Sequence, residues 1–129
     1  MKLLLKVLVD SSLLMLCAER GRDYLSILED KLGEKLEFLV PAIVWNELSH
    51  LASRPGKKGK TAKIALEIAK SMAVVNMGSG GSVDDRLEKL AKDLGIAVAT
   101  VDAGLARRLR RQRIKILMVG RSGEPRILG

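Results

Sequence analysis

The feature that most restricts the fold is a series of short, almost entirely apolar runs, each separated from the next by a segment with helical spacing. The runs cover residues 3–9, 36–40, 73–75, 96–99 and 114–119. Runs that are too apolar for one solvated face are typical of parallel strands buried on both faces. Because these strands alternate with helices, the sequence predicts an α/β fold: a three-layer α/β/α domain with a central parallel sheet of about five strands.

The intervening segments supply the predicted helices. They cover residues 13–20, 23–31, 41–51, 60–72, 84–94 and 103–112. Pro41 fits the first turn of its helix, whereas Gly33 and Gly95 fit helix ends. The length of 129 residues suits one domain that covers residues 1–129. Residues 120–129 follow the last predicted strand, and we expect them to form a loosely attached tail.

Composition restricts the class of protein. Cys17 is the single cysteine and cannot form an internal disulfide, and no apolar stretch reaches the roughly 20 residues that a membrane span needs. We therefore expect a soluble, cytoplasmic protein with no membrane partner. Lys and Arg number 23 against 15 Asp and Glu, a net charge of +8 that favours a polyanionic partner such as RNA. One Trp, one Tyr and one Phe are too few for a base-stacking platform.

Acidic residues occupy the places where sites form in such folds. Open parallel sheets bind ligands outside the carboxyl ends of their strands. Asp10 closes the first apolar run, and Asp102 follows the fourth. Glu47 lies in the helix after the second strand, beside apolar positions that predict a partly buried carboxylate. Asp84 and Asp85 open the helix that follows the glycine-rich segment 78–82.

Carboxylates that converge from these positions predict a metal site. They would repel each other, by about 4 kcal/mol per close pair at an effective dielectric constant of 20, unless a divalent cation neutralised them. Oxygen ligands favour Mg²⁺ or Mn²⁺, and the chemistry that follows is phosphodiester hydrolysis. Asp84, Asp85 and Asp102 each have a structural alternative, because an aspartate at the start of a helix is also a good cap.

Four segments of the chain together resemble the acidic motifs of PIN-domain nucleases. They are residues 9–12 (VDSS), 41–48 (PAIVWNEL), 83–87 (VDDRL) and 99–102 (ATVD). The resemblance covers nearly the whole chain in order and spacing. It implies a PIN fold, a homodimer, and a Mg²⁺- or Mn²⁺-dependent endoribonuclease that acts on single-stranded RNA.

The resemblance also implies roles for individual residues. The implied catalytic and metal-binding carboxylates are Asp10, Glu47, Asp84 and Asp102. Ser12 and Thr100 would be their polar supports. The position of Leu87 selects Asp84 as the third acid, which makes Asp85 an auxiliary metal ligand or a surface acid. Within the family, the chain is similar to toxin-type VapC nucleases, which would bring an antitoxin protein as partner, and to archaeal relatives that process ribosomal RNA.

Two basic clusters are candidates for binding the RNA backbone. One follows Asp102 and contains Arg107, Arg108 and Arg111; the other consists of Lys57, Lys58 and Lys60. Either cluster could instead be a solvated face. The alternative function is a non-catalytic, basic nucleic-acid-binding module. Such a module would have no reason to gather four acids, because their charges repel a nucleic acid unless a metal is bound.

Overall fold

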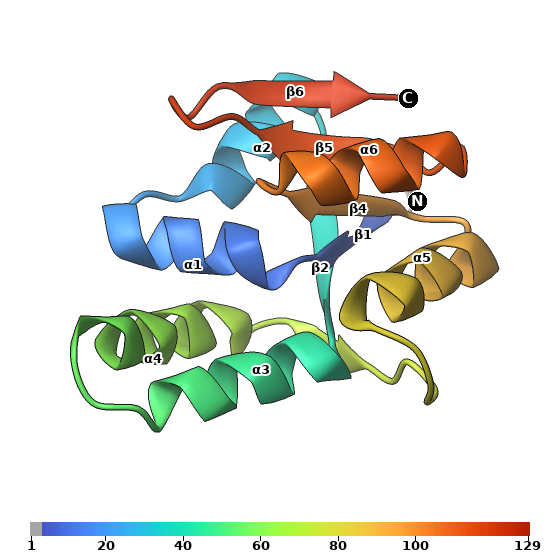
Figure 1. Ribbon diagram of the computed structural model, residues 1–129. Coiled ribbons are helices and arrows are strands. Elements are labelled where there is room, and N and C mark those ends of the chain that lie inside the picture. Colours follow the sequence, from blue (N-terminus) through green and yellow to red (C-terminus); the bar gives the residue numbers. More distant parts are fainter. Residues whose placement is uncertain (1–3) are drawn as a thin grey trace.

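The protein is described by a computed structural model that covers residues 4–129, in which helices and strands alternate along most of the chain (Figure 1). In chain order the elements are β1 (Leu5–Val9), α1 (Ser11–Arg20), α2 (Tyr24–Leu32), β2 (Leu36–Pro41), α3 (Ala42–Ala52), α4 (Lys57–Ala69), β3 (Ala73–Val75), α5 (Val83–Leu94), β4 (Ala97–Thr100), α6 (Ala103–Arg111), β5 (Ile116–Val119) and β6 (Pro125–Leu128). Leu3, which the sequence assigns to the first strand, lies outside the described residues.

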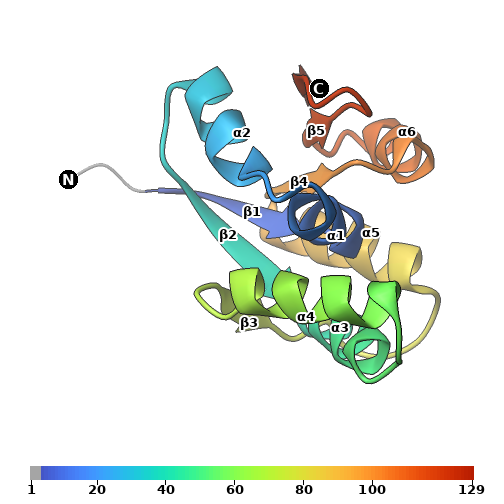
Figure 2. The same ribbon diagram turned by 90° about the vertical axis from the view of Figure 1, so that its left-hand side faces the viewer.

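Within residues 4–129, the strands form one sheet of six strands in the order β3-β2-β1-β4-β5-β6. The five predicted strands are all present, and they pair in parallel with one another. Helices cover both faces of the sheet, so the α/β class and its three layers are confirmed (Figure 1, Figure 2). None of the helices in residues 4–129 is long and apolar enough to cross a lipid bilayer.

Each face of the sheet has its own apolar core. Helices α1 to α4 enclose one core, to which β1 contributes Val7 and Val9. Helices α5 and α6 enclose the other, which receives Leu8 from the same strand. Because successive side chains of a strand point to opposite faces, the continuous apolar run of β1 fills both cores.

The strand order creates a switch point between β1 and β4. From β1 the chain builds outward to β2 and β3, and then returns to the other side of β1 with β4 and β5. Val9 pairs with Ala99, and the next residue, Asp10, donates its backbone N–H to the Ala99 carbonyl at 3.0 Å. The two strands therefore end at the same level. Open α/β sheets bind ligands at such a point, because the connections after the two strands leave in opposite directions and open a crevice.

The prediction of a loose tail at residues 120–129 is wrong. Pro125–Leu128 form β6, which pairs antiparallel with β5 and adds a sixth strand to the predicted five. A turn connects them, in which the Gly120 N–H donates to the Glu124 carbonyl at 2.9 Å. Pro125 is tolerated because it begins an edge strand, where no inward backbone N–H is required.

The start of α4 and the place of Pro41 also differ from prediction. α4 begins at Lys57 rather than at residue 60, and Gly59 explains the difference. Gly59 is buried, and a Cβ added there would lie 1.9 Å from the Arg54 carbonyl oxygen. Only glycine therefore lets α4 begin so close to the end of α3. Pro41 is the last residue of β2 and the N-cap of α3, not part of the first helical turn.

Candidate active site

Asp10 lies at the switch point, in the centre of a group of hydrogen-bonded side chains. Its side chain is buried, with only 7% of the residue exposed, and it directly precedes α1. The Ser12 hydroxyl donates to Asp10 Oδ2 at 2.5 Å, and the Thr100 hydroxyl donates to the same oxygen at 2.9 Å. Oδ1 takes part in neither bond. The two hydroxyls therefore fix the orientation of the carboxylate and leave its second oxygen to another ligand.

The same two hydroxyls also bind the backbone of the neighbouring connection. Ser12 Oγ accepts the Val101 N–H at 3.3 Å, and Thr100 Oγ1 accepts the Asp102 N–H at 3.0 Å. The two hydroxyl oxygens lie 3.1 Å apart. Ser12 follows β1, whereas Thr100 ends β4 and Val101 and Asp102 follow it. This network therefore ties the connection that follows β1 to the connection that follows β4.

Burial raises the pKa of Asp10 above its ordinary value of 3.8. The hydrogen bonds from Ser12 and Thr100 act in the opposite direction, because they favour the ionised carboxylate. The negative charges of Asp102 and Glu47 raise the pKa further. A cation bound beside Asp10 would offset this repulsion between carboxylates.

Asp102 and Glu47 are positioned by the helices that carry them. Asp102 is the N-cap of α6, and its Oδ1 accepts the Leu105 N–H at 3.1 Å. The capping alternative for Asp102 is thus correct, while its role in the site stays a prediction. Glu47 is exposed, because the side chains that α3 buries are Val44 and Leu48. The expectation that Glu47 is partly buried is therefore wrong.

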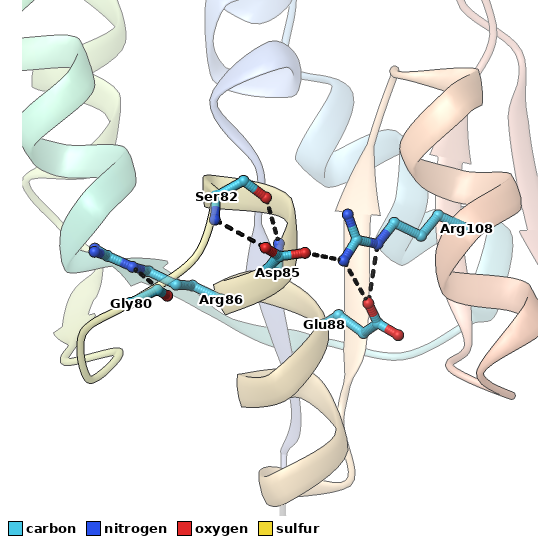
Figure 3. A network of polar contacts seen from close by, with 6 residues as sticks. All are labelled: Gly80, Ser82, Asp85, Arg86, Glu88 and Arg108. Atoms are coloured by element: carbon cyan, nitrogen blue, oxygen red, sulfur yellow. Dashed lines mark hydrogen bonds and ion pairs between the residues drawn. The ribbon is translucent and has the colours of Figure 1, made fainter.

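Asp84 and Asp85 begin α5, and the structure gives them different surroundings. Asp84 is half-buried. Asp85 forms a capping box with Ser82: its N–H donates to the Ser82 hydroxyl at 3.1 Å, and its Oδ2 accepts the Ser82 N–H at 2.9 Å. Arg108 donates to the other carboxylate oxygen (Figure 3). These bonds, that of Arg108 foremost, lower the pKa of Asp85 to about 2.

Arg108 also bonds to Glu88, an acid that the sequence analysis did not single out. Its Nε and one terminal nitrogen approach Glu88 Oε2 at 2.9 and 2.8 Å (Figure 3). The two residues are 20 positions apart, so no local spacing indicates the pair. The only signal is that Glu88 lies one helical turn after Asp84, on the same side of an amphipathic helix.

The predicted RNA-binding residues differ in how they are engaged. Arg107 and Arg111 are exposed and lie one turn apart on α6. Arg108 is half-buried, and its guanidinium is bonded to the two acids of α5. The lysines of the second cluster are exposed in the first turn of α4; they are Lys57, Lys58 and Lys60.

The donor atoms around Asp10 suit a hard cation. Within residues 4–129, no three acidic, histidine or cysteine side chains form a group that could hold a metal ion by themselves. Mg²⁺ and Mn²⁺ do not require such a cage, because one or two carboxylates hold them while water and substrate phosphate complete the shell. Asp10, with Asp102 and Glu47 near it, offers carboxylate oxygens of this kind. The residues therefore fit an ion that binds together with a phosphate.

Comparisons with solved structures agree with this fold. The PIN domain endonuclease Utp24 matches with a TM-score of 0.77 and 26% sequence identity, over 95% of this chain and 90% of that one. A domain of a functionally unknown protein from Methanocaldococcus jannaschii DSM 2661 matches with a TM-score of 0.67 and 20% identity, over 96% of this chain and 97% of the other. This second likeness shows the fold alone.

The sequence itself matches a protein family over most of its length. A search of curated proteins gives no match. The family described as "PIN like domain" matches residues 7–121, from β1 to the turn that follows β5. The matched segment includes all the acids of the candidate site. The chain has the fold of PIN-domain nucleases and belongs to the PIN-like domain family.

Proposed function

We propose that this protein is a Mg²⁺- or Mn²⁺-dependent endoribonuclease that hydrolyses phosphodiester bonds in single-stranded RNA. The observation that carries the proposal is the buried carboxylate of Asp10, oriented by Ser12 and Thr100 at the switch point of a PIN-like fold. The likeness to the PIN domain endonuclease Utp24 supports cleavage within a nucleic-acid chain. The net charge of +8 supports a polyanionic substrate.

The proposed catalytic ligands are the four carboxylates Asp10, Glu47, Asp84 and Asp102. The chemistry that a divalent cation supplies there is neutralisation of the phosphate charge and a lower pKa for the attacking water. Ser12 and Thr100 hold Asp10 in one orientation, so its oxygen does not have to be reoriented during the reaction. The homodimer, the antitoxin partner and the cytoplasmic location stay predictions.

The proposed RNA contact runs along α6. This helix begins directly after Asp102, and its buried side chains, Leu105 and Leu109, face the sheet. Arg107 and Arg111 lie on the opposite, exposed side. An RNA strand whose phosphates bind these two arginines would therefore run from the proposed metal-binding carboxylates along α6.

Cleavage of single-stranded RNA by the purified protein tests the catalytic part of the proposal. We expect cutting with Mg²⁺ or Mn²⁺, none in EDTA, and none by Asp10→Asn. Asp30→Asn is the matched control, because Asp30 is an exposed acid on α2 and should leave cutting unchanged. Undiminished cutting in EDTA would refute metal dependence, and single-stranded DNA cut as readily as RNA would refute the substrate class.

Binding measured with uncleaved RNA tests the substrate contact separately. Removal of one phosphate contact should lower the slope of log K against log salt by about 0.7 for a single strand. We therefore expect Arg107→Ala and Arg111→Ala each to weaken binding and flatten the slope, whereas Lys31→Ala on α2 should change neither. If the wild type binds RNA with full salt dependence but cuts none under any metal, the protein is the non-catalytic binding module instead.

A further inference from the structure

Two polar links between α5 and α6 show how these helices lie against each other. Arg108 Nε donates to Glu88 Oε2 at 2.9 Å, and Lys92 Nζ donates to Gln112 Oε1 at 2.9 Å. The partners are 20 residues apart in both pairs. The second pair lies four residues after the first along both segments, from Glu88 to Lys92 and from Arg108 to Gln112. Since four residues are about one turn, α5 and α6 run in the same direction with a fixed register.

This register brings two of the proposed ligands to the same level. One turn before Glu88 is Asp84, and the corresponding position one turn before Arg108 is Gly104. Gly104 belongs to the first turn of α6, two residues after Asp102. Asp84 and Asp102 therefore lie at a similar level, at the beginnings of two parallel helices, although they belong to different crossover connections of the sheet.

Arg108 is the link that lies nearest to this end of the helices. It bonds to Asp85, the residue next to Asp84, and to Glu88, one turn further along (Figure 3). Asp85 also closes the capping box that starts α5, so Arg108 holds the whole first turn. Forked, charge-assisted bonds to two carboxylates are the kind of surface ion pair that retains a defined geometry.

We propose that Arg108 is a positioning residue that fixes Asp84 relative to Asp102 by binding the first turn of α5 to α6. The inference rests on the proposed function, because it assumes that Asp84 and Asp102 bind the metal. It assigns Asp85 and Glu88 to the support of the site rather than to the metal. It also separates Arg108 from its neighbour Arg107, which is exposed and which the proposed function assigns to the RNA.

Mn²⁺ binding measured by electron paramagnetic resonance tests this role without a readout of cleavage. The titration is made with the protein alone and with a bound 2′-O-methyl RNA oligonucleotide. Loss of a residue that orients metal ligands typically lowers metal affinity 10- to 100-fold. We expect Arg108→Gln to lower Mn²⁺ affinity about tenfold, and Arg108→Lys to recover part of the loss because an ammonium can still bind one acid. Arg110→Gln, at an exposed arginine of the same helix to which no role in the site is assigned, should leave Mn²⁺ affinity unchanged.

The combination of Asp85→Asn with Arg108→Gln distinguishes support from direct ligation. If Arg108 acts through Asp85, the double variant should bind Mn²⁺ no worse than Arg108→Gln alone. A loss in Asp85→Asn well beyond that of Arg108→Gln would make Asp85 a ligand and overturn the assignment. Where Arg108→Gln does not unfold cooperatively, Glu88→Gln replaces it, because this change removes only one of the two partners.

The remaining outcomes separate the two proposals. Wild-type protein that binds Mn²⁺ in neither condition contradicts the proposed function. Wild-type protein that binds Mn²⁺, with Arg108→Gln binding it equally well, contradicts only the positioning role. Weakened RNA binding with unchanged Mn²⁺ binding in Arg108→Gln would make Arg108 a phosphate contact and would likewise overturn the inference.

Discussion

Replacement of Thr100 by valine should destabilise the protein through the loss of one hydroxyl. Valine has nearly the same shape as threonine, so the packing of this fully buried residue is kept. The change removes the bond that Thr100 donates to Asp10 Oδ2 and the acceptor of the Asp102 N–H. Asp10 keeps the bond from Ser12, but its carboxylate stays buried with one partner fewer.

The expected loss follows from the two bonds. A hydrogen bond to a charged group contributes about 1.5–3 kcal/mol, and a neutral one contributes about 0.5–1.5 kcal/mol. The Asp102 N–H lies at the exposed start of α6, where water can replace part of its bond. We therefore expect Thr100→Val to lower the free energy of unfolding by about 2–4 kcal/mol, a large share of the roughly 5–15 kcal/mol of a typical domain.

Urea denaturation of three variants measures this loss. Thr100→Ser keeps the hydroxyl and removes only a methyl group, which should lower the stability by about 1 kcal/mol. Thr61→Val removes a hydroxyl that binds only the Lys57 carbonyl within α4, and its effect should stay within about 0.5 kcal/mol. If Thr100→Val is no less stable than Thr100→Ser, the hydroxyl does not hold Asp10 as the geometry indicates.

Three further predictions concern the metal, helix packing and pH. Mn²⁺ at ten times its dissociation constant should raise the free energy of unfolding of the wild type by about 1.4 kcal/mol; equal stabilisation of Asp10→Asn would contradict the assigned ligand. Gly59→Ala should lower the stability by about 1–3 kcal/mol in urea denaturation, despite the better helix propensity of alanine, because its Cβ meets the Arg54 carbonyl. Lys58→Ala in the same turn should leave the stability unchanged. A Gly59→Ala variant more stable than the wild type would disprove the close contact. Burial raises the pKa of the Cys17 thiol above 9.0, so the stabilisation by the protonated thiol is complete below pH 9 and is lost as the pH rises through the native pKa. In urea denaturation from pH 8 to 10, the free energy of unfolding should decline less for Cys17→Ala than for the wild type. Parallel declines of the two proteins would contradict this prediction.

Much of the sheet could be predicted because each of its first five strands is marked by its own short segment of sequence. β1 to β5 are apolar runs that end at polar or turn residues, and this pattern alone places Asp10 and Asp102 at strand ends. The parallel order then brings the two residues to neighbouring strands. β6 could not be predicted in this way, because Pro125–Leu128 becomes a strand only by pairing with the free edge of β5.

The contacts of the site depend on distances that the sequence does not contain. Glu47 is next to Leu48, a residue of the apolar stripe of α3, and this position suggests burial. Consecutive residues are about 100° apart around a helix, however, so Glu47 is exposed while Leu48 is buried. Arg108 looks like one of several arginines of a basic helix. Only the packing of α5 against α6 shows that it binds acids 20 and 23 positions earlier.

The antiparallel course of β6 has a practical consequence for experiments. β5 runs toward the end of the sheet where Asp10 lies, so β6 returns to the opposite end, and Gly129 lies against Lys115. A fluorophore, affinity tag or surface tether attached after Gly129 would therefore emerge at the end of the sheet opposite to Asp10. Immobilised protein could bind an oligonucleotide without obstruction by its own anchor.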